Sequence, residues 1–183
     1  MIKKDGGVEE RRTLLEEDGE KKLAKDAPLK TKLFYSLKSV YGPVGFLSKE
    51  SQSLYSFELQ GEDKFLGREA HVLKSRPKGT VKIDRNYGTI WVDKENSSVL
   101  KIEMDQESLE GYESLKARAE KRKTRPVLAA IHEYGIEKNG IRFPSRTVFE
   151  ESYVGPWIPK YLNSQVIIEY KNYRFFTVEV KID

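Results

Sequence analysis

The amino-acid sequence predicts a mainly β protein with a few helices, in which antiparallel strands form one curved, incomplete barrel. From residue 55 onward, most of the chain alternates apolar with polar side chains, the pattern of strands with one buried face. Turn sequences such as Leu66-Gly67 and Asn139-Gly140 separate these segments at short intervals, so we expect a meander and not a parallel βαβ sheet. The expected strands are residues 55–61, 68–76, 88–93, 99–104, 127–137, 141–150, 165–170 and 174–182.

The N-terminal part of the chain has a weaker pattern. Residues 8–17 fit either a short helix or a charged edge strand, and Asp18-Gly19 turns the chain toward a return strand over residues 21–25. We favour the strand interpretation for this pair. Residues 29–40 have apolar side chains at helical spacing but also fit a strand, so both interpretations stay open.

Two short helices are expected beside the strands. Residues 44–54 place apolar side chains on one helical face, and Ser48 is a suitable cap for a final turn. Residues 106–123 begin with acidic and end with basic side chains, which complements the helix dipole. Pro126 ends this second helix. Its apolar face consists of Leu109, Tyr112, Leu115 and Ala119.

Residues 88–104 contain the clearest hairpin of the chain. Side chains alternate between the two faces of a strand, so Ile90 and Val92 share one face of the first strand. The same rule places Leu100 and Ile102 on one face of the second strand. We expect these four side chains to line the inner face of the sheet, with Trp91 and Asp93 on the opposite face.

The composition predicts a single domain over residues 1–183, with a charged segment over residues 1–28. The chain is 38% hydrophobic and 34% charged, which leaves enough apolar side chains for a core. It contains no cysteine, which excludes disulfides and thiol catalysis. No apolar run reaches the roughly 18 residues that a membrane-spanning helix needs, and no apolar signal core follows the first four residues.

Sequence motifs give no support to catalysis, a metal site or a cofactor. His71 and His132 lie in separate expected strands and lack the spacing of a metalloprotease or triad motif, so we interpret both as structural histidines of the sheet. The adjacent glycines Gly6-Gly7 follow no strand and precede no phosphate-binding lysine, which argues against nucleotide binding. We therefore expect a protein that is not an enzyme and needs no cofactor.

A run of basic residues between Lys116 and Arg125 is the main concentration of charge. Three interpretations are open: a solvated helix end, a nucleic-acid site, or contact with an anionic membrane surface. The net charge of only +4 is a weak argument for nucleic acid, so no nucleic-acid partner is expected. A solvated helix end is the simplest interpretation, and membrane contact stays a hypothesis.

Apolar and aromatic side chains recur along the expected sheet and its helices. A curved antiparallel sheet with such a face either packs it with its own helices or encloses a cavity. We take them as candidates for the lining and lid of a hydrophobic cavity. The candidates are Phe34, Phe46, Leu47, Leu54, Phe57, Leu59, Val72, Ile90, Val92, Leu100, Ile102, Phe143, Ile168 and Phe176.

The order of several motifs resembles a known family. These motifs are Tyr-Ser-Phe-Glu-Leu-Gln-Gly-Glu from residue 55, Gly-Arg-Glu-Ala-His-Val-Leu from residue 67, the 88–103 hairpin, Gly-Ile-Arg-Phe-Pro-Ser-Arg from residue 140, and the segment 169–178. Together they resemble the C-terminal two thirds of bacterial outer-membrane lipoprotein-sorting proteins of the LolA/LolB-like superfamily. The resemblance covers about residues 29–182.

This resemblance implies a half-barrel whose helices form a lid over a hydrophobic cavity for acyl chains. It implies a periplasmic or outer-membrane-associated, non-enzymatic protein with lipid or lipoprotein acyl chains as ligands and envelope proteins as partners. The chain departs from the family in lacking a signal peptide and a lipidated cysteine. The long N-terminal strand and helix that the family would have are absent from this chain or replaced by a charged segment, as in an N-terminally truncated form. The resemblance assigns no individual functional residue.

Two other functions stay open. The chain could be a structural or interaction domain with a filled core, which binds a protein partner by strand addition or through its basic helix. An enzyme acting on a lipid or polysaccharide has no motif in its favour. The size of the cavity separates the first two functions, because a carrier needs an empty space of several hundred Å³.

Overall fold

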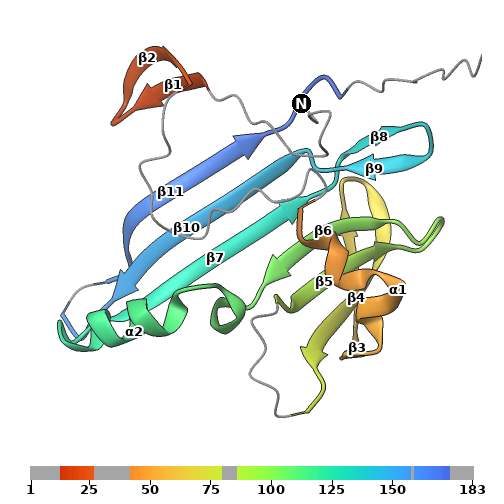
Figure 1. The fold of residues 1–183 in the computed structure, drawn as a ribbon, viewed down its shortest axis with the longest axis horizontal. Coiled ribbons are helices and arrows are strands. Elements are labelled where there is room, and N and C mark those ends of the chain that lie inside the picture. The colour runs from red at the N-terminus through yellow and green to blue at the C-terminus, as the bar shows by residue number, and fades with distance from the viewer. Residues whose placement is uncertain (1–12, 27–41, 80–85, 158, 174–183) are drawn as a thin grey trace, which may run out of the picture.

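The computed structural model describes residues 13–26, 42–79, 86–157 and 159–173 (Figure 1). Antiparallel strands dominate them, and helices are few and short, as the sequence predicts. The helical segments are η1 (Gly42–Leu47), α1 (Lys49–Gln52), η2 (Gln106–Ser108) and α2 (Tyr112–Glu120). The strands are β1 (Thr13–Glu17), β2 (Glu20–Lys25), β3 (Tyr55–Phe65), β4 (Arg68–Pro77), β5 (Gly88–Asp93), β6 (Val99–Met104), β7 (Arg125–Glu133), β8 (Ile136–Lys138), β9 (Ile141–Phe143), β10 (Arg146–Val154) and β11 (Tyr161–Glu169).

Seven strands form the main sheet in the order β11-β10-β7-β6-β5-β4-β3. Every neighbouring pair is antiparallel, so the predicted meander is confirmed. The sheet twists strongly, and β3 and β4 run across the direction of β10 and β11 (Figure 1). Its two outer strands, β3 and β11, do not pair with each other, so the described strands form an open sheet and not a closed barrel.

A row of paired residues crosses the sheet from edge to edge and defines one of its faces. Residues directly opposite each other on paired strands point to the same side. The central pair, Ile90 and Ile102, is completely buried, whereas Leu59 at the β3 edge is 61% exposed. The apolar face is therefore covered in its middle and open at the β3 edge. The row is Leu59, Leu73, Ile90, Ile102, His132, Thr147 and Ile168.

The helical segments all lie on this face and cover its centre. The buried face of α2 is the one that its spacing predicts, since Tyr112, Leu115 and Ala119 are buried. The expected helix over residues 106–123 is divided, however, because Gly111 adopts a left-handed φ of 83° between η2 and α2. The apolar cluster under these segments, here called the main core, also contains Phe46 of η1, Ile90 and Ile102. η1 and α2 therefore share one core.

The opposite face of the sheet carries a smaller core. It contains Leu100, which was expected on the same face as Ile102. Trp91 and Asp93 lie opposite the main core as expected, and both are buried there. Leu100 was expected to accompany Ile102, and that prediction is wrong. The pairing of β5 with β6 shifts after Trp91, so that Leu100 is an extra, bulged residue that packs with Trp91 and Ala70.

Several expected strands have different boundaries, since β3 and β11 are longer than predicted and the predicted segment 127–137 is divided between β7 and β8. The predicted segment 141–150 is interrupted at Pro144 and Ser145, so its first part forms the small β8–β9 hairpin and its second part begins β10. The Asn139-Gly140 hairpin turn is confirmed, with φ of 54° and 72° at the two residues.

The strand interpretation of the N-terminal segment is confirmed where the structure describes it. β1 and β2 pair across the turn at Asp18 and Gly19, and the side chains of β2 are all exposed. Residues 1–12, the expected segment 29–40 and the expected strand 174–182 lie outside the described residues.

Candidate ligand pocket

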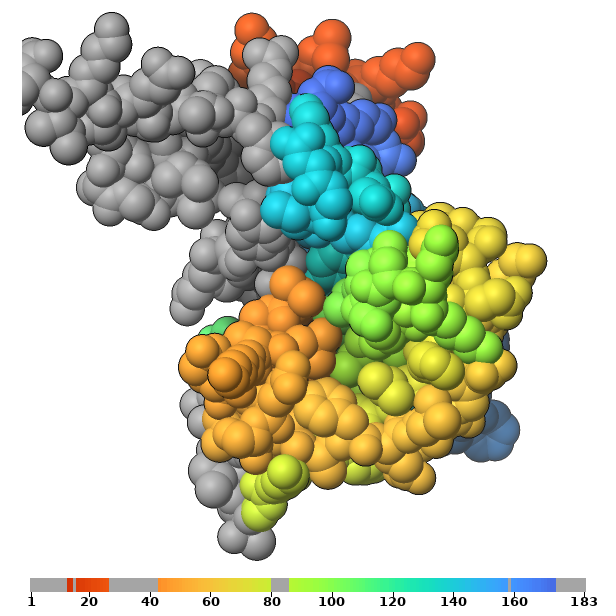
Figure 2. Space-filling view, turned by 90° about the vertical axis from the view of Figure 1, so that its right-hand side faces the viewer, coloured from red at the N-terminus to blue at the C-terminus, as the bar shows by residue number. Residues whose placement is uncertain are grey.

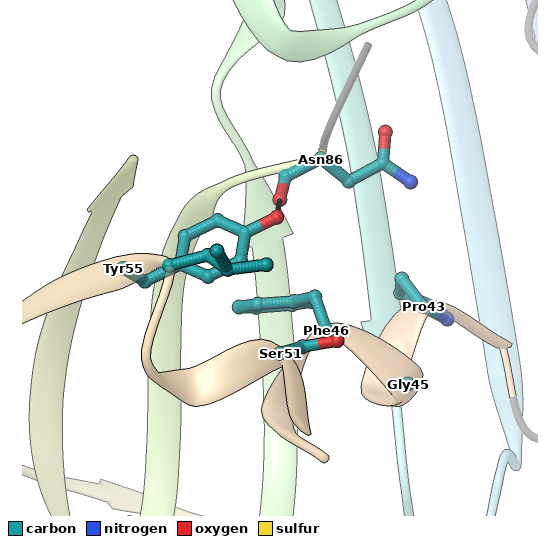
Figure 3. Close-up of a pocket in the computed structure, with 7 residues that line it drawn as sticks. Pro43, Gly45, Phe46, Ser51, Tyr55 and Asn86 are labelled. Carbon is teal, nitrogen blue, oxygen red and sulfur yellow. Dashed lines mark hydrogen bonds between the residues drawn. The ribbon is translucent and has the colours of Figure 1, made fainter. Parts of the chain in front are cut away.

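A pocket of about 350 Å³ lies between the η1–α1 segment and the start of β3 (Figure 3). This volume is near the lower end of the range for small-molecule sites, roughly 300–1,000 Å³. None of the lining side chains carries a charge at neutral pH, and Ser51, Tyr55 and Asn86 supply polar side-chain atoms. The site is therefore uncharged, with both apolar and polar surface. It is lined by Pro43, Gly45, Phe46, Ser51, Leu54, Tyr55 and Asn86.

The η1–α1 segment is built from two short helical pieces instead of the single helix expected over residues 44–54. The predicted cap is confirmed, because the Ser48 hydroxyl accepts a hydrogen bond from the Ser51 N–H at 3.3 Å. Two hydrogen bonds hold the end of this segment in place. Gln52 donates to the carbonyl of Leu47 at 2.8 Å, and the N–H of Lys78, just after β4, donates to the carbonyl of Leu54 at 2.8 Å.

Phe46 holds this segment against the sheet. Among the described side chains of η1 and α1, Phe46 alone is buried, with 8% of its surface exposed. Its ring centre lies 5.5 Å from that of Tyr55, in a tilted arrangement (Figure 3). The Tyr55 hydroxyl donates to the carbonyl of Asn86 at 3.2 Å, which fixes the ring on the far side of the pocket.

Tyr134, in the loop after β7, also contacts η1. Burial raises the pKa of Tyr134 above its ordinary value, whereas a hydrogen bond to the backbone of Val44 acts in the opposite direction. The hydroxyl is therefore protonated at all physiological pH values. It joins the start of the helical segment to the main core.

The candidate lining residues divide into groups, and only Phe46 and Leu54 line this pocket. Leu47 and Val92 are partly buried against the main core. Phe57 and Leu59 lie on β3, where they are 37% and 61% exposed.

The other candidates lie elsewhere in the sheet. Ile90 and Ile102 are completely buried in the main core, which is filled at that point. Leu100 and Val72 belong to the smaller core on the opposite face. Phe143, the last residue of β9, is buried, and its ring centre lies 4.7 Å from that of Tyr173.

Three candidates remain. Ile168 is half-buried on β11, the other outer strand. Phe34 and Phe176 lie outside the described residues.

Sequence reasoning missed five of the seven lining residues. Pro43, Gly45 and Asn86 lie in connecting segments, where no periodic pattern marks them. Ser51 shares a helical face with Leu47 and Leu54 in the helix expected over residues 44–54, so its spacing was a usable signal. Tyr55 begins a strand directly after Leu54, and its burial follows from the contact with Phe46.

The two histidines do not form a site together. His132 is buried on β7, and its Nδ1 lies 3.1 Å from the Thr147 hydroxyl. Burial lowers the pKa of His132 to about 4, so the ring is neutral at physiological pH. His71 is exposed on β4, 3.8 Å from Glu62. In the described part of the chain, no three His, Cys, Asp or Glu side chains are grouped closely enough to hold a metal ion.

Comparison of the chain with protein-family models, curated proteins and solved structures finds no significant match. Likewise, no helix in the described ranges is both long enough and apolar enough to span a bilayer.

Proposed function

We propose that this chain is a non-enzymatic, carrier-like protein of the bacterial envelope that binds acyl chains of lipids or lipoproteins, as the LolA/LolB resemblance implies. In this proposal the open sheet is the half-barrel, and the η1–α1 segment is the lid over the ligand cavity. The pocket under that segment supports the proposal, because it is neutral and joins the main apolar core through Phe46.

The weak attachment of the lid supports a gating role. α1 has no buried side chain, and Phe46 is the one buried side chain of the described η1–α1 segment, with Val44 and Leu47 partly buried beside it. Burial of one phenylalanine stabilises by roughly 1.5–3 kcal/mol, and each methylene transferred from water contributes about 0.8 kcal/mol. About two to four methylenes of an acyl chain would therefore offset the displacement of the Phe46 ring.

The space behind Phe46 explains how a small pocket would hold a longer chain. Tyr55, Ile90 and Met104 belong to the same cluster as Phe46. When the ring swings outward, these side chains become the wall of an extended apolar channel. Figure 2 shows the η1–α1 segment in orange at the surface, beside the yellow strands β3 and β4. An outward swing of the Phe46 ring would therefore carry it toward solvent.

Native mass spectrometry of the protein purified from a bacterial host tests the proposal directly. We expect co-purified lipid, and displacement of a fluorescent fatty acid by unlabelled fatty acid. Phe46→Ala should speed association of the fluorescent probe several-fold. Phe143→Ala is the control, because Phe143 is also buried, with 3% of its surface exposed, but lies outside the pocket. The absence of both co-purified lipid and probe binding would refute the carrier function.

A second function is favoured by the filled centre of the main core. Ile90 and Ile102 have no exposed surface, so a large cavity would have to open there before a ligand enters. The alternative is an interaction domain that adds a partner strand to β3, an outer strand with Phe57 and Leu59 exposed. Protection of β3 amides from hydrogen exchange by a partner protein, without lipid binding, would support this alternative.

A further inference from the structure

Trp157 is almost fully exposed, with 93% of its surface accessible. It lies in the turn that joins β10 to β11. A tryptophan side chain has a large apolar surface and one N–H donor, and it partitions well into the interface between lipid headgroups and acyl chains. Tyr161 and Leu162, at the start of β11, are also exposed, at 40% and 55%. The turn therefore presents apolar and aromatic surface to the solvent.

The C-terminal end of α2 and the segment after it carry the basic run. Six basic side chains are exposed there, and Glu120 is the only acidic residue between the first and the last of them. None of the six takes part in an ion pair within the described ranges. The six residues, here called the basic cluster, are Lys116, Arg118, Lys121, Arg122, Lys123 and Arg125.

Strand pairing brings the basic cluster to the same end of the sheet as Trp157. The chain turns directly from α2 into β7, since the N–H groups of Arg122 and Thr124 bond to the carbonyl of Ala119. Arg125, the first residue of β7, pairs with Val154, the last residue of β10. Trp157 follows Val154 by three residues, a chain length of at most about 11 Å. Figure 1 shows the end of α2 beside the β10–β11 turn.

We propose that this end of the sheet, formed by the basic cluster and Trp157, docks on an anionic lipid membrane. The basic side chains would lie over the headgroups, and the indole ring would enter the interface. Lys160 adds little charge, because it pairs with Glu150 at 2.7 Å. A single-stranded nucleic acid would need a basic groove lined with several stacking aromatic rings. One exposed tryptophan at the tip of a turn fits a bilayer better.

The docking surface is separate from the acyl pocket. The pocket lies under α1, at the opposite side of the view in Figure 1 from the β10–β11 turn. Membrane docking and acyl binding can therefore fail independently, and a variant in one should leave the other unchanged.

Vesicle sedimentation tests the docking surface. The full chain should bind vesicles of phosphatidylcholine mixed with phosphatidylglycerol, and bind phosphatidylcholine alone much more weakly. Each basic residue near an anionic surface changes affinity roughly fivefold. The triple variant Lys121→Gln, Arg122→Gln, Lys123→Gln should therefore bind the mixed vesicles about 100-fold more weakly.

A triple variant with the same change of charge is the matched control. Lys21, Lys22 and Lys25 are exposed on β2, and their replacement by Gln should leave vesicle binding within about twofold of the parent. Equal weakening by both triple variants would overturn the proposal, as would tighter binding to a single-stranded oligonucleotide than to the mixed vesicles.

Tryptophan fluorescence gives a second readout. The chain has two tryptophans, and Trp91 is only 7% exposed, so a blue shift on vesicle addition reports mainly Trp157. Trp157→Ser should abolish the shift and weaken binding several-fold, whereas Leu23→Ser, at an 84% exposed apolar side chain on β2, should change neither. A blue shift that persists in Trp157→Ser would contradict insertion of the indole ring.

Discussion

Arg68 and Asp93 form an ion pair that joins the first residue of β4 to the last residue of β5. The Asp93 side chain is only 2% exposed because arginine side chains cover it close to the molecular surface. The second of these, Arg142, comes from β9 and has a nitrogen 3.9 Å from the same carboxylate. One carboxylate thus connects the main sheet with the β8–β9 hairpin.

Replacement of this carboxylate should destabilise the protein. Asp93→Asn removes the charge that faces two arginines. In the parent protein, Oδ1 of Asp93 also accepts a hydrogen bond from the N–H of Glu95 at 2.9 Å. Because the pair lies near the surface, solvent screens it. We therefore expect the free energy of unfolding, measured with urea, to fall by about 1–2 kcal/mol. Glu95→Gln is the control, since that side chain is 81% exposed and should cost less than about 0.5 kcal/mol. Equal losses of unfolding free energy in the two variants would refute the role of Asp93 in joining the strands.

His132 should make the protein less stable in mild acid. Its folded-state pKa of about 4 lies below the unfolded value of about 6.5, so the unfolded state binds the proton more readily. The associated stability is complete above pH 6.5 and is lost as the pH falls through 4, by roughly 3 kcal/mol at most. Urea unfolding between pH 7 and pH 4 measures this loss. His132→Gln should flatten the profile, and an unchanged slope in this variant would contradict the role of His132.

Gly88 should not tolerate a side chain. A Cβ atom at this position would lie 2.0 Å from the carbonyl oxygen of Glu103 and 2.8 Å from the Cα of Met104. Both are backbone atoms of the neighbouring strand, so β5 and β6 would have to separate. Gly88→Ala should lower the free energy of unfolding by about 3 kcal/mol. Gly45→Ala meets open space and should leave it nearly unchanged, so a large loss there would contradict this reasoning.

Removal of the Phe46 ring should release the η1–α1 segment locally. In Phe46→Ala, we expect faster hydrogen exchange at the amide of Lys78, whose bond to Leu54 ties the segment to β4. Amides at the centre of β7 should exchange at the parent rate after correction for any change in global stability. Uniform acceleration across the sheet would show that Phe46 supports the whole core and not the segment alone.

Local sequence patterns predicted the strands well. The β5 and β6 boundaries, the Asn139-Gly140 turn and the buried face of α2 were all predictable, because side-chain alternation and turn chemistry act over a few residues. The position of Leu100 was not predictable. Its face depends on a shifted pairing between two strands, and a bulge reverses the side that alternation assigns.

The pocket was harder to predict than the sheet for a related reason. Most candidate lining residues are apolar side chains in strands, and a filled core uses the same residues as a cavity wall. Ile90 and Ile102 show this, since both were expected at a cavity and both are completely buried. Of the described candidates, Phe46 and Leu54 lie at the observed pocket, whereas Leu47 of the same segment packs against the main core.

The strand order has a consequence for how the chain acquires its fold. From β3 to β7, each strand pairs with its neighbour in sequence, and in the described chain the β8–β9 hairpin lies between β7 and its partner β10. The β3–β4 and β5–β6 turns are short and cost little entropy to close, whereas η2 and α2 lie between β6 and β7, so either hairpin can form first and the other strands can add to it. We therefore expect rapid refolding for a β protein of this size, with growth of the sheet outward from its central strands.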